Sequence, residues 1–295
     1  MNQTLLFVVN PVSGKAKARS VLMDILSVFS THGFMPTVHI TRQQGDACRV
    51  VAEHAKSFDR IVCCGGDGTL NEVISGMLMS GVNKPIGYIP LGSTNDFAAG
   101  LKLPTVPTEA AERAVTGTAH PIDVGQFRDR YFSYIASFGA FTAASYSATQ
   151  SAKNLLGHTA YVLEGVKDIV NIRPMCVWLQ ADGRTYNGPY VFGAISNSLS
   201  VGGLVKLDPR LVDVQDGLFE VTLVRQPQSL ADLNRILTAV STGDFTDNPM
   251  FEFFKASDIT VRCREPFAWS LDGEYAHGDE EIRIRNKKQA ISIII

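Results

Sequence analysis

The sequence predicts an α/β + β protein, with an N-terminal doubly wound parallel-sheet α/β domain followed by a β-rich domain of the sandwich or barrel type. Up to about residue 120, short apolar segments alternate with segments of helical periodicity, which is typical of a parallel sheet with helices on both faces. After that point, candidate strands follow one another with few helices between them. The length of 295 residues is also sufficient for two domains.

The first apolar segment, residues 5–9, predicts a strand buried on both faces. The elements expected after it are a polar loop at 10–15, a helix at about 17–32, a strand at 37–41, a helix at about 46–55, a strand at 60–64, a helix after 69, a strand at 86–89 and a helix near 107–116. Loops that follow parallel strands meet along one edge of the sheet, where open α/β proteins bind ligands. Here those loops are 10–15, 41–45, 65–69 and 90–96.

A glycine-rich segment, Gly65–Thr69, lies between one of these strands and the helix after it. Thr69 with Glu72 three positions later predicts a capping box, and Gly81 predicts the C-cap. Glycines allow a ligand to approach the backbone closely, and a helix N-terminus favours phosphate. An acid in such a place, Asp67, is repulsive to phosphate unless a cation lies between them, so the segment predicts Mg-ATP. The alternative is a tight turn whose aspartate only caps the helix.

The second half of the chain is expected to be mainly β. Candidate strands are 122–127, 131–138, 175–181, 190–196, 219–224, 259–263, 267–271, 281–285 and 290–294, with helices at about 155–171 and 229–241. We therefore expect a nucleotide-binding domain at 1–125 and a β-rich domain at 126–287. The last strand, 288–295, is open to rejoining the first domain.

Composition excludes several classes of protein. The net charge of −2 does not favour nucleic-acid binding, and no apolar stretch is long enough for a transmembrane span. The N-terminus lacks the basic residues of a signal peptide. Five cysteines without a CxxC pair favour a reducing compartment over a zinc site or a disulfide framework. These features predict a cytoplasmic protein.

Four motifs resemble those of one family. They are Asn10-Pro11-x-Ser13-Gly14, Gly65-Gly66-Asp67-Gly68-Thr69, Pro90-x-Gly92-Ser93-Thr94-Asn95-Asp96 and Leu271-Asp272-Gly273-Glu274. Their order resembles the diacylglycerol kinase catalytic domain, in its soluble bacterial lipid kinase branch. The resemblance implies an NAD kinase-like first domain. It also implies an ATP-dependent enzyme that transfers the γ-phosphate to a lipid hydroxyl, converting diacylglycerol to phosphatidic acid. Alternatives are an NAD kinase-like enzyme with a soluble acceptor, or a kinase for phosphatidylglycerol or a sphingoid base.

The resemblance also implies roles for individual residues. The nucleotide-binding set is Asn10, Pro11, Val12, Ser13, Gly14, Thr41, Gly65, Gly66, Asp67, Gly68, Thr69, Leu70, Asn71, Glu72, Thr94 and Asn95. Lys15, Lys17 and Arg19 could meet phosphate or lie on a solvated helix face. The carboxylates that resemble the set holding the catalytic Mg²⁺, partly through waters, are Asp67, Asp96, Asp123 and Glu274. The catalytic residues are expected to be Asp272, Glu274 and Asp67.

Asp272 matches the family's general base, which accepts the proton of the acceptor hydroxyl. If the segment is extended, Asp272 and Glu274 lie on one side of it. The alternative is a hairpin turn, because Asp-Gly is a common turn pair. A second, structural Mg²⁺ is implied at the turn before residue 219, held by Asp216 with the carbonyls of Asp213 and Leu218; a plain Asp-Gly turn is again the alternative.

The implied partner is a lipid substrate at the membrane surface, reached by a peripheral protein at the inner membrane face. A homodimer is left open, and neither nucleic-acid binding nor a transmembrane span is expected. The apolar segment 154–157, with Tyr161, Val162 and Val166 after it, is expected to line the lipid cleft or else to belong to the second core.

Overall fold

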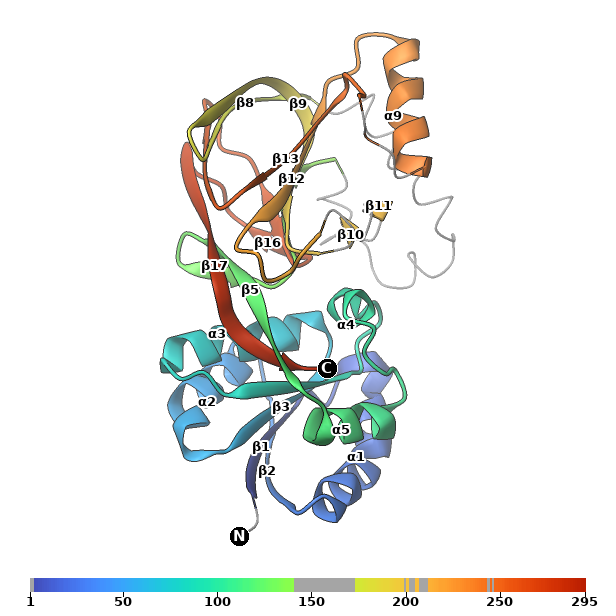
Figure 1. Ribbon diagram of the computed structural model, residues 1–295, viewed down its shortest axis with the longest axis vertical. Coiled ribbons are helices and arrows are strands. Elements are labelled where there is room, and N and C mark those ends of the chain that lie inside the picture. Colours follow the sequence, from blue (N-terminus) through green and yellow to red (C-terminus); the bar gives the residue numbers. More distant parts are fainter. Residues whose placement is uncertain are drawn as a thin grey trace. The chain divides into compact units, whose positions relative to one another are not determined.

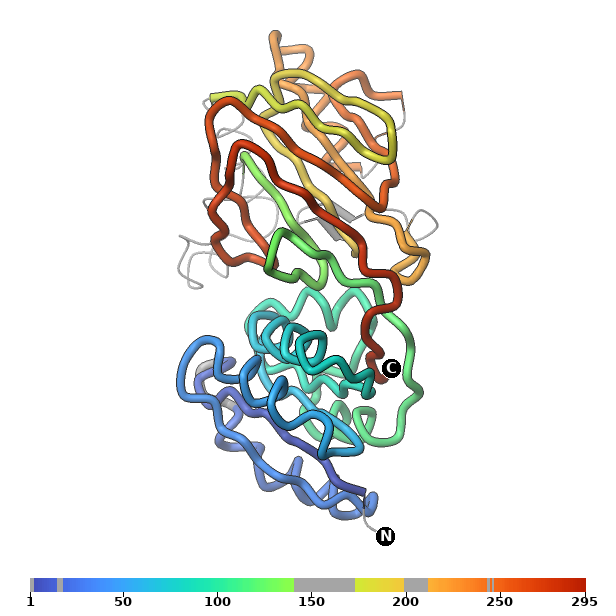
Figure 2. Tube along the Cα trace, turned by 90° about the vertical axis from the view of Figure 1, so that its left-hand side faces the viewer, coloured from blue at the N-terminus to red at the C-terminus, as the bar shows by residue number. Residues whose placement is uncertain are grey.

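The computed structural model describes residues 3–140, 173–198, 200–201, 205–206, 212–242, 245 and 247–295. The chain forms two compact units (Figures 1 and 2). Unit 1 contains residues 1–124 together with 288–295, and unit 2 contains residues 125–287. The last strand therefore returns to unit 1. The segment 141–172, which includes the predicted helix at 155–171 and the apolar segment 154–157, lies outside the described residues.

Unit 1 is built on a parallel sheet in the order β17-β4-β3-β1-β2. The strands are β1 (Gln3–Val9), β2 (Phe34–Ile40), β3 (Arg60–Gly65), β4 (Pro85–Pro90) and the end of β17 (Glu281–Ile294). Residues Leu5–Val9 are at most 3% exposed, so both faces of β1 are covered, as their apolar run predicts. The end of β17 joins this sheet beside β4, where Ile293 pairs with Ile86.

Five helices accompany the strands of unit 1. They are α1 (Ser13–Thr31), α2 (Asp46–His54), α3 (Asp67–Ser80), α4 (Asp96–Gly100) and α5 (Pro107–Thr116). Helices α2 and α3 pack on each other, as do α1 and α5, and Figure 1 shows the two pairs on opposite faces of the sheet. The predicted doubly wound α/β domain is confirmed. It requires helices on both faces, because strands buried on both faces need two apolar covers.

Three local features of unit 1 test the sequence predictions. The capping box is wrong: α3 begins at Asp67 with Gly66 as N-cap, and no side chain caps it. Glu72 does not reach back to Thr69, because both its carboxylate oxygens accept backbone N–H groups of the neighbouring loop at residues 45 and 47. Gly81 is confirmed as a left-handed C-cap, with φ of 69°. Helix α1 starts at Ser13, so the predicted loop at 10–15 is shorter than expected.

Unit 2 is a β-rich unit, which confirms the second half of the predicted fold class. Its strands are the end of β5 (Ala119–Phe127), β6 (Arg130–Phe132), β7 (Ile135–Gly139), β8 (Met175–Ala181), β9 (Arg184–Ser196), β12 (Phe219–Arg225), β13 (Phe251–Ala256), β14 (Asp258–Cys263), β15 (Trp269–Leu271), β16 (Glu274–Ala276) and the start of β17. They pair in the order β16-β15-β7-β9-β8-β14-β17, and β12 lies between β9 and β13. A short hairpin, β10 (Ser200–Val201) with β11 (Val205–Lys206), and helix α9 (Leu230–Thr242) complete the described part. Aromatic side chains fill the core, including Phe132, Phe138, Phe219 and Trp269.

The boundaries of some unit 2 strands differ from the sequence prediction. Strand β13 was not predicted, because Phe251–Ala256 lacks a clean alternation of apolar and polar residues. The predicted strand at 131–138 is two strands, interrupted at residues 133–134. The two predicted C-terminal strands form the single strand β17, which passes from unit 2 into unit 1.

Candidate active site

The loops at the carboxyl ends of the unit 1 strands are joined by hydrogen bonds. The Asn10 amide donates to the Thr69 hydroxyl at 2.9 Å and thereby ties loop 10–12 to the start of α3. The Thr41 N–H donates to the Val9 carbonyl at 2.9 Å, and the Leu91 N–H donates to the Gly65 carbonyl at 2.7 Å. The structure thus brings together the four loops that the strand alternation places on one edge.

Two glycines let loops 65–69 and 90–96 touch through their backbones. A Cβ on Gly66 would lie 3.1 Å from the Gly92 Cα, and a Cβ on Gly92 would lie 2.6 Å from the Gly66 Cα. Any side chain at residue 92 would therefore force the loops apart. Asn95 stabilises the second loop from within, because it adopts φ of 54° and its amide donates to the Gly92 carbonyl at 3.0 Å. Thr94, at the tip of this loop, is exposed.

Asp67 joins these two loops through its carboxylate. It accepts the Asp96 N–H at 3.0 Å and the Phe97 N–H at 3.3 Å, both at the start of α4. The aspartate therefore caps α4 rather than its own helix, which corrects the capping alternative considered for it. Burial, together with the negative charge of Asp67, raises the pKa of the neighbouring Tyr88 hydroxyl far above its usual range. The Asp67 carboxylate is thus held in place among the loops by two backbone N–H groups.

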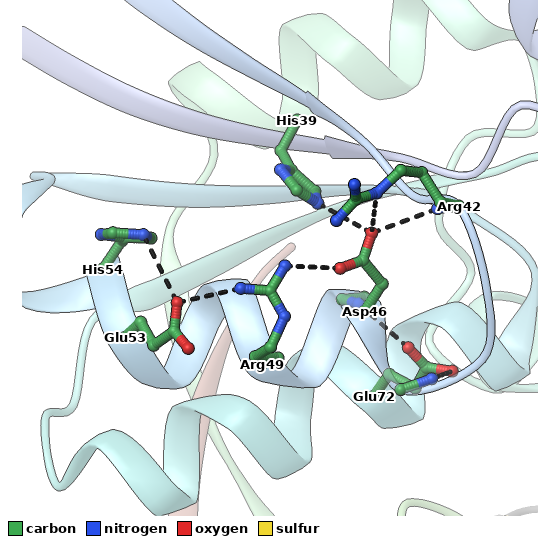
Figure 3. Close-up of polar contacts among 9 residues, drawn as sticks. His39, Arg42, Asp46, Arg49, Glu53, His54 and Glu72 are labelled. Carbon is green, nitrogen blue, oxygen red and sulfur yellow. Dashed lines mark hydrogen bonds and ion pairs between the residues drawn. The ribbon is translucent and has the colours of Figure 1, made fainter.

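The loop after β2 is held by carboxylates from two helices (Figure 3). Glu72 of α3 accepts the Gly45 N–H at 2.8 Å and the Ala47 N–H at 3.1 Å. Asp46 is buried and accepts hydrogen bonds from the Arg49 guanidinium at 2.7 Å and the Arg42 N–H at 3.1 Å, with the His39 ring at 3.2 Å. Asp46 was not singled out from the sequence, although Arg49 at i+3 on a helix was a usable signal.

We expect Asp46→Asn to remove an acid-dependent part of the stability of unit 1. The hydrogen bond from Arg49 is the largest cause that holds the pKa of Asp46 far below its ordinary value of 3.8. A depressed folded-state pKa contributes stability that is fully present above the unfolded-state pKa of about 4 and is lost progressively as the pH falls from there toward the folded-state pKa. In thermal melts at pH 7, Asp46→Asn should have a lower Tm than the parent protein, which corresponds to a loss of about 2 kcal/mol in the free energy of unfolding. Between pH 7 and pH 3, the Tm of Asp46→Asn should fall less steeply than that of the parent protein. Asp24→Asn, at an exposed site of α1, is the control; an acid profile for Asp46→Asn as steep as that of the parent protein would contradict this prediction.

In unit 2, Asp272 lies in a two-residue turn and not in an extended segment. Leu271 pairs with Glu274, and Asp272 and Gly273 between them have φ of 49° and 85°, as in a type I′ hairpin. The hairpin alternative is therefore correct for the backbone, and the extended interpretation is wrong. The turn reverses the chain, because Asp-Gly tolerates positive φ at both positions.

Asp272 is 7% exposed, and its carboxylate is surrounded by donors from the β6–β7 connection. One oxygen, Oδ2, accepts the Ser133 N–H at 2.6 Å and the Ser133 hydroxyl at 2.8 Å. The other, Oδ1, accepts the Tyr134 N–H at 3.1 Å and the Ile135 N–H at 3.0 Å. Burial raises the pKa of this carboxyl group, although the four hydrogen bonds oppose the rise. Of the four donors, only the serine hydroxyl can rotate away.

The other acids implied for Mg²⁺ have separate environments. Asp123 of unit 1 is fully buried and accepts the Gln289 N–H of β17 at 2.7 Å. Glu274 of unit 2 is 3.5 Å from Arg130, and its side chain is 43% exposed. Among the described residues, no three Asp, Glu, His or Cys side chains come together as a metal cage. A divalent ion at these acids would therefore need further oxygen ligands, such as phosphates and waters.

The turn implied for a second metal has a cation from the protein beside it. The Asp216 carboxylate accepts the Leu218 N–H at 2.8 Å and lies 2.8 Å from the Lys255 ammonium. The Asp213 carboxylate accepts the Gln215 N–H of its own turn at 3.1 Å. Sequence reasoning missed Lys255, which lies on a different strand.

Comparisons with known proteins agree with this architecture. The model of the diacylglycerol kinase catalytic domain matches residues 4–127, and that of the YegS C-terminal NAD kinase beta sandwich-like domain matches residues 135–295. A diacylglycerol kinase from Bacillus subtilis is 34% identical over 268 residues, covering 90% of this chain and 88% of the relative. One from Staphylococcus carnosus is 30% identical over 295 residues, covering 99% and 95%.

The fold is also found among solved structures. The crystal structure of a diacylglycerol kinase from Bacillus anthracis superposes with a TM-score of 0.82 at 24% identity, covering 99% of this chain and 96% of the other. In the described part of the chain, no helix has the length and apolar character needed to cross a membrane.

Proposed function

This chain belongs to the diacylglycerol kinase family and is a lipid kinase, and we propose that it transfers the γ-phosphate of ATP to the free hydroxyl of diacylglycerol, with Mg²⁺, to give phosphatidic acid. The observation that carries the proposal is the joined edge of four strand-end loops in unit 1, which contains both glycine-rich motifs. The relatives named diacylglycerol kinase support the choice of lipid.

Unit 1 is proposed to bind the nucleotide. Its glycine-rich loops have no side chains that would keep a phosphate away from the backbone. The same lack of Cβ atoms lets the backbones at Gly66 and Gly92 come close to each other. The first turn of α3 offers N–H groups and partial positive charge. Residues 10–14, Thr41, 65–72, Thr94 and Asn95 are the proposed contacts. Glu72 contributes by holding the end of loop 41–45 and the start of α2, because its two oxygens accept the Gly45 and Ala47 N–H groups.

The proposed Mg²⁺ would neutralise charge on the phosphates. Asp67, Asp96 and Asp123 of unit 1 are the carboxylates proposed to hold it, mainly through water. Mg²⁺ bound to a nucleotide takes only one or two carboxylates directly.

Asp272 is proposed as the general base. The acceptor hydroxyl would replace the Ser133 hydroxyl on Asp272 Oδ2, and the carboxylate would take its proton as the oxygen attacks phosphorus. The O–H bond breaks, the new O–P bond forms, the bond to the ADP oxygen breaks, and the proton later passes to solvent. The three backbone N–H donors would hold the carboxylate in orientation meanwhile.

The lipid substrate implies that the protein works as a peripheral, cytoplasmic enzyme at the inner membrane face. The test uses labelled ATP with vesicles containing diacylglycerol, phosphatidylglycerol or a sphingoid base, and separately with soluble NAD. Labelled phosphatidic acid from the diacylglycerol vesicles alone supports the proposal. Label only in NADP, or only in another lipid, would reject diacylglycerol as the substrate.

A further inference from the structure

The turn at residues 213–218 precedes β12 and uses its own polar groups to close. The Asp213 carboxylate accepts the Gln215 N–H, and the Asp216 N–H points to the Asp213 carbonyl at 3.4 Å. Asp216 Oδ1 accepts the Leu218 N–H at 2.8 Å. Since Oδ1 is bonded within the turn, Oδ2 of Asp216 is the carboxylate oxygen directed to a partner outside it.

That partner is Lys255 of β13. Its ammonium lies 2.8 Å from Asp216 Oδ2, and the same nitrogen lies 3.2 Å from Glu220 Oε1. The strand register explains the second contact, because Glu220 of β12 and Lys255 of β13 are directly opposite each other. Opposed residues of an antiparallel pair have their side chains on the same face. One ammonium therefore bridges two carboxylates.

The burial of Glu220 favours this bridge. The Glu220 side chain is 0% exposed, and a buried carboxylate is costly unless a cation lies beside it. Lys255 is the cation that meets it: its side chain is 30% exposed, and its ammonium lies 3.2 Å from Glu220 and 2.8 Å from Asp216.

We propose that Lys255 serves as the built-in cation of this turn, in place of the structural Mg²⁺ that the family resemblance implies there. Mg²⁺ requires about six oxygen ligands at about 2.1 Å, and an ammonium 2.8 Å from Asp216 Oδ2 would compete with such an ion for that oxygen. We therefore expect the turn to be stable without a divalent ion.

The experiment measures thermal unfolding without nucleotide, in EDTA and across a MgCl₂ series, with the full chain. The parent protein should give the same Tm throughout. Lys255→Met keeps the stem and removes the charge, so its Tm in EDTA should fall by about 5–10 °C. Added Mg²⁺ should restore part of that loss, because Asp216 and Glu220 then face each other without a cation. Lys287→Met, at an exposed lysine of β17, should leave the Tm unchanged.

Two further variants keep the test decisive. Lys255→Arg retains a cation and should stay close to the parent Tm, with no response to Mg²⁺, even if Lys255→Met fails to fold. Asp216→Asn shows whether any Mg²⁺-dependent rise in the Tm of the parent protein comes from this turn. A rise in Tm that persists in Asp216→Asn comes from another site and agrees with the proposal. A Mg²⁺-dependent rise in the parent that Asp216→Asn abolishes would overturn it, as would a Lys255→Met protein as stable in EDTA as the parent.

Discussion

Asp272→Asn is expected to lower kcat by about 10²–10⁴, because the acceptor hydroxyl loses the group that takes its proton. Affinity for ATP should stay within a few-fold of the parent value, since the lost interaction belongs to the transition state. The substitution also has a structural effect. In asparagine, an NH₂ group that cannot accept hydrogen bonds replaces one of the two carboxylate oxygens. Each oxygen of Asp272 accepts two hydrogen bonds, so two of the four donors of residues 133–135 lose their acceptor.

The chain offers a matched control for that structural effect. Asp182 and Gly183 form a second hairpin of the same kind in unit 2, with φ of 44° and 84°. The Asp182 carboxylate accepts the Ser257 N–H, the Ser257 hydroxyl and the Asp258 N–H, so a serine again donates twice. Asp182 is exposed, whereas Asp272 is buried. The two turns therefore share their hydrogen-bonding role and differ in surroundings.

Comparison of Asp272→Asn with Asp182→Asn separates catalysis from folding. Both variants should lower the Tm, because each leaves backbone donors with fewer acceptors, at about 1–3 kcal/mol for a buried donor. Only Asp272→Asn should lower kcat, measured well below either Tm and across a Mg²⁺ series. Ser133→Ala, which removes the one rotatable donor, should retain most of kcat. Normal kcat in Asp272→Asn, or its rescue by Mg²⁺, would show that Asp272 is a turn or metal-site residue.

These twin hairpins show why the sequence alone left the role of Asp272 open. Ala181-Asp182-Gly183-Arg184 and Leu271-Asp272-Gly273-Glu274 carry the same turn signal. The difference between them comes from burial, which depends on strands β6, β7 and β15 coming together. Local residue types predict the turn, and only the tertiary structure distinguishes an exposed carboxylate from an enclosed one.

The α/β half of the chain was more predictable for a related reason. Alternating strands and helices are local patterns, and parallel order then places the loops after β1, β2, β3 and β4 on one edge. Contacts between distant residues were not predictable in this way. Glu72 was assigned to a capping box because Thr69 is close in sequence, whereas its carboxylate bonds to a loop more than 20 positions earlier. Lys255 meets Asp216 across 39 positions, and no local pattern links them.

Asp67→Ala is expected to abolish kinase activity, with a loss of at least about 10³ in kcat/KM, because two functions depend on one carboxylate. Its charge is proposed to help hold Mg-ATP, and its oxygens accept the two N–H groups that begin α4. Removing them should release loop 90–96 from loop 65–69 and cost about 1 kcal/mol of stability, as for the loss of a helix cap. Calorimetric titration should therefore show Mg-ATP affinity at least about tenfold weaker.

Asp59→Ala is the matched control for Asp67→Ala. Asp59 also accepts a backbone N–H, from Thr4 at 2.8 Å. It precedes β3, however, and so lies at the opposite edge of the same sheet. It should lower the Tm slightly and leave kcat and Mg-ATP affinity unchanged. Asp67→Asn retains one acceptor for α4 without the charge, so a Tm near the parent value together with lost Mg-ATP affinity would assign the main effect to charge. Unchanged Mg-ATP affinity in Asp67→Ala would reject Asp67 as part of the nucleotide site, since both its charge and its hold on the loops would then be dispensable for binding.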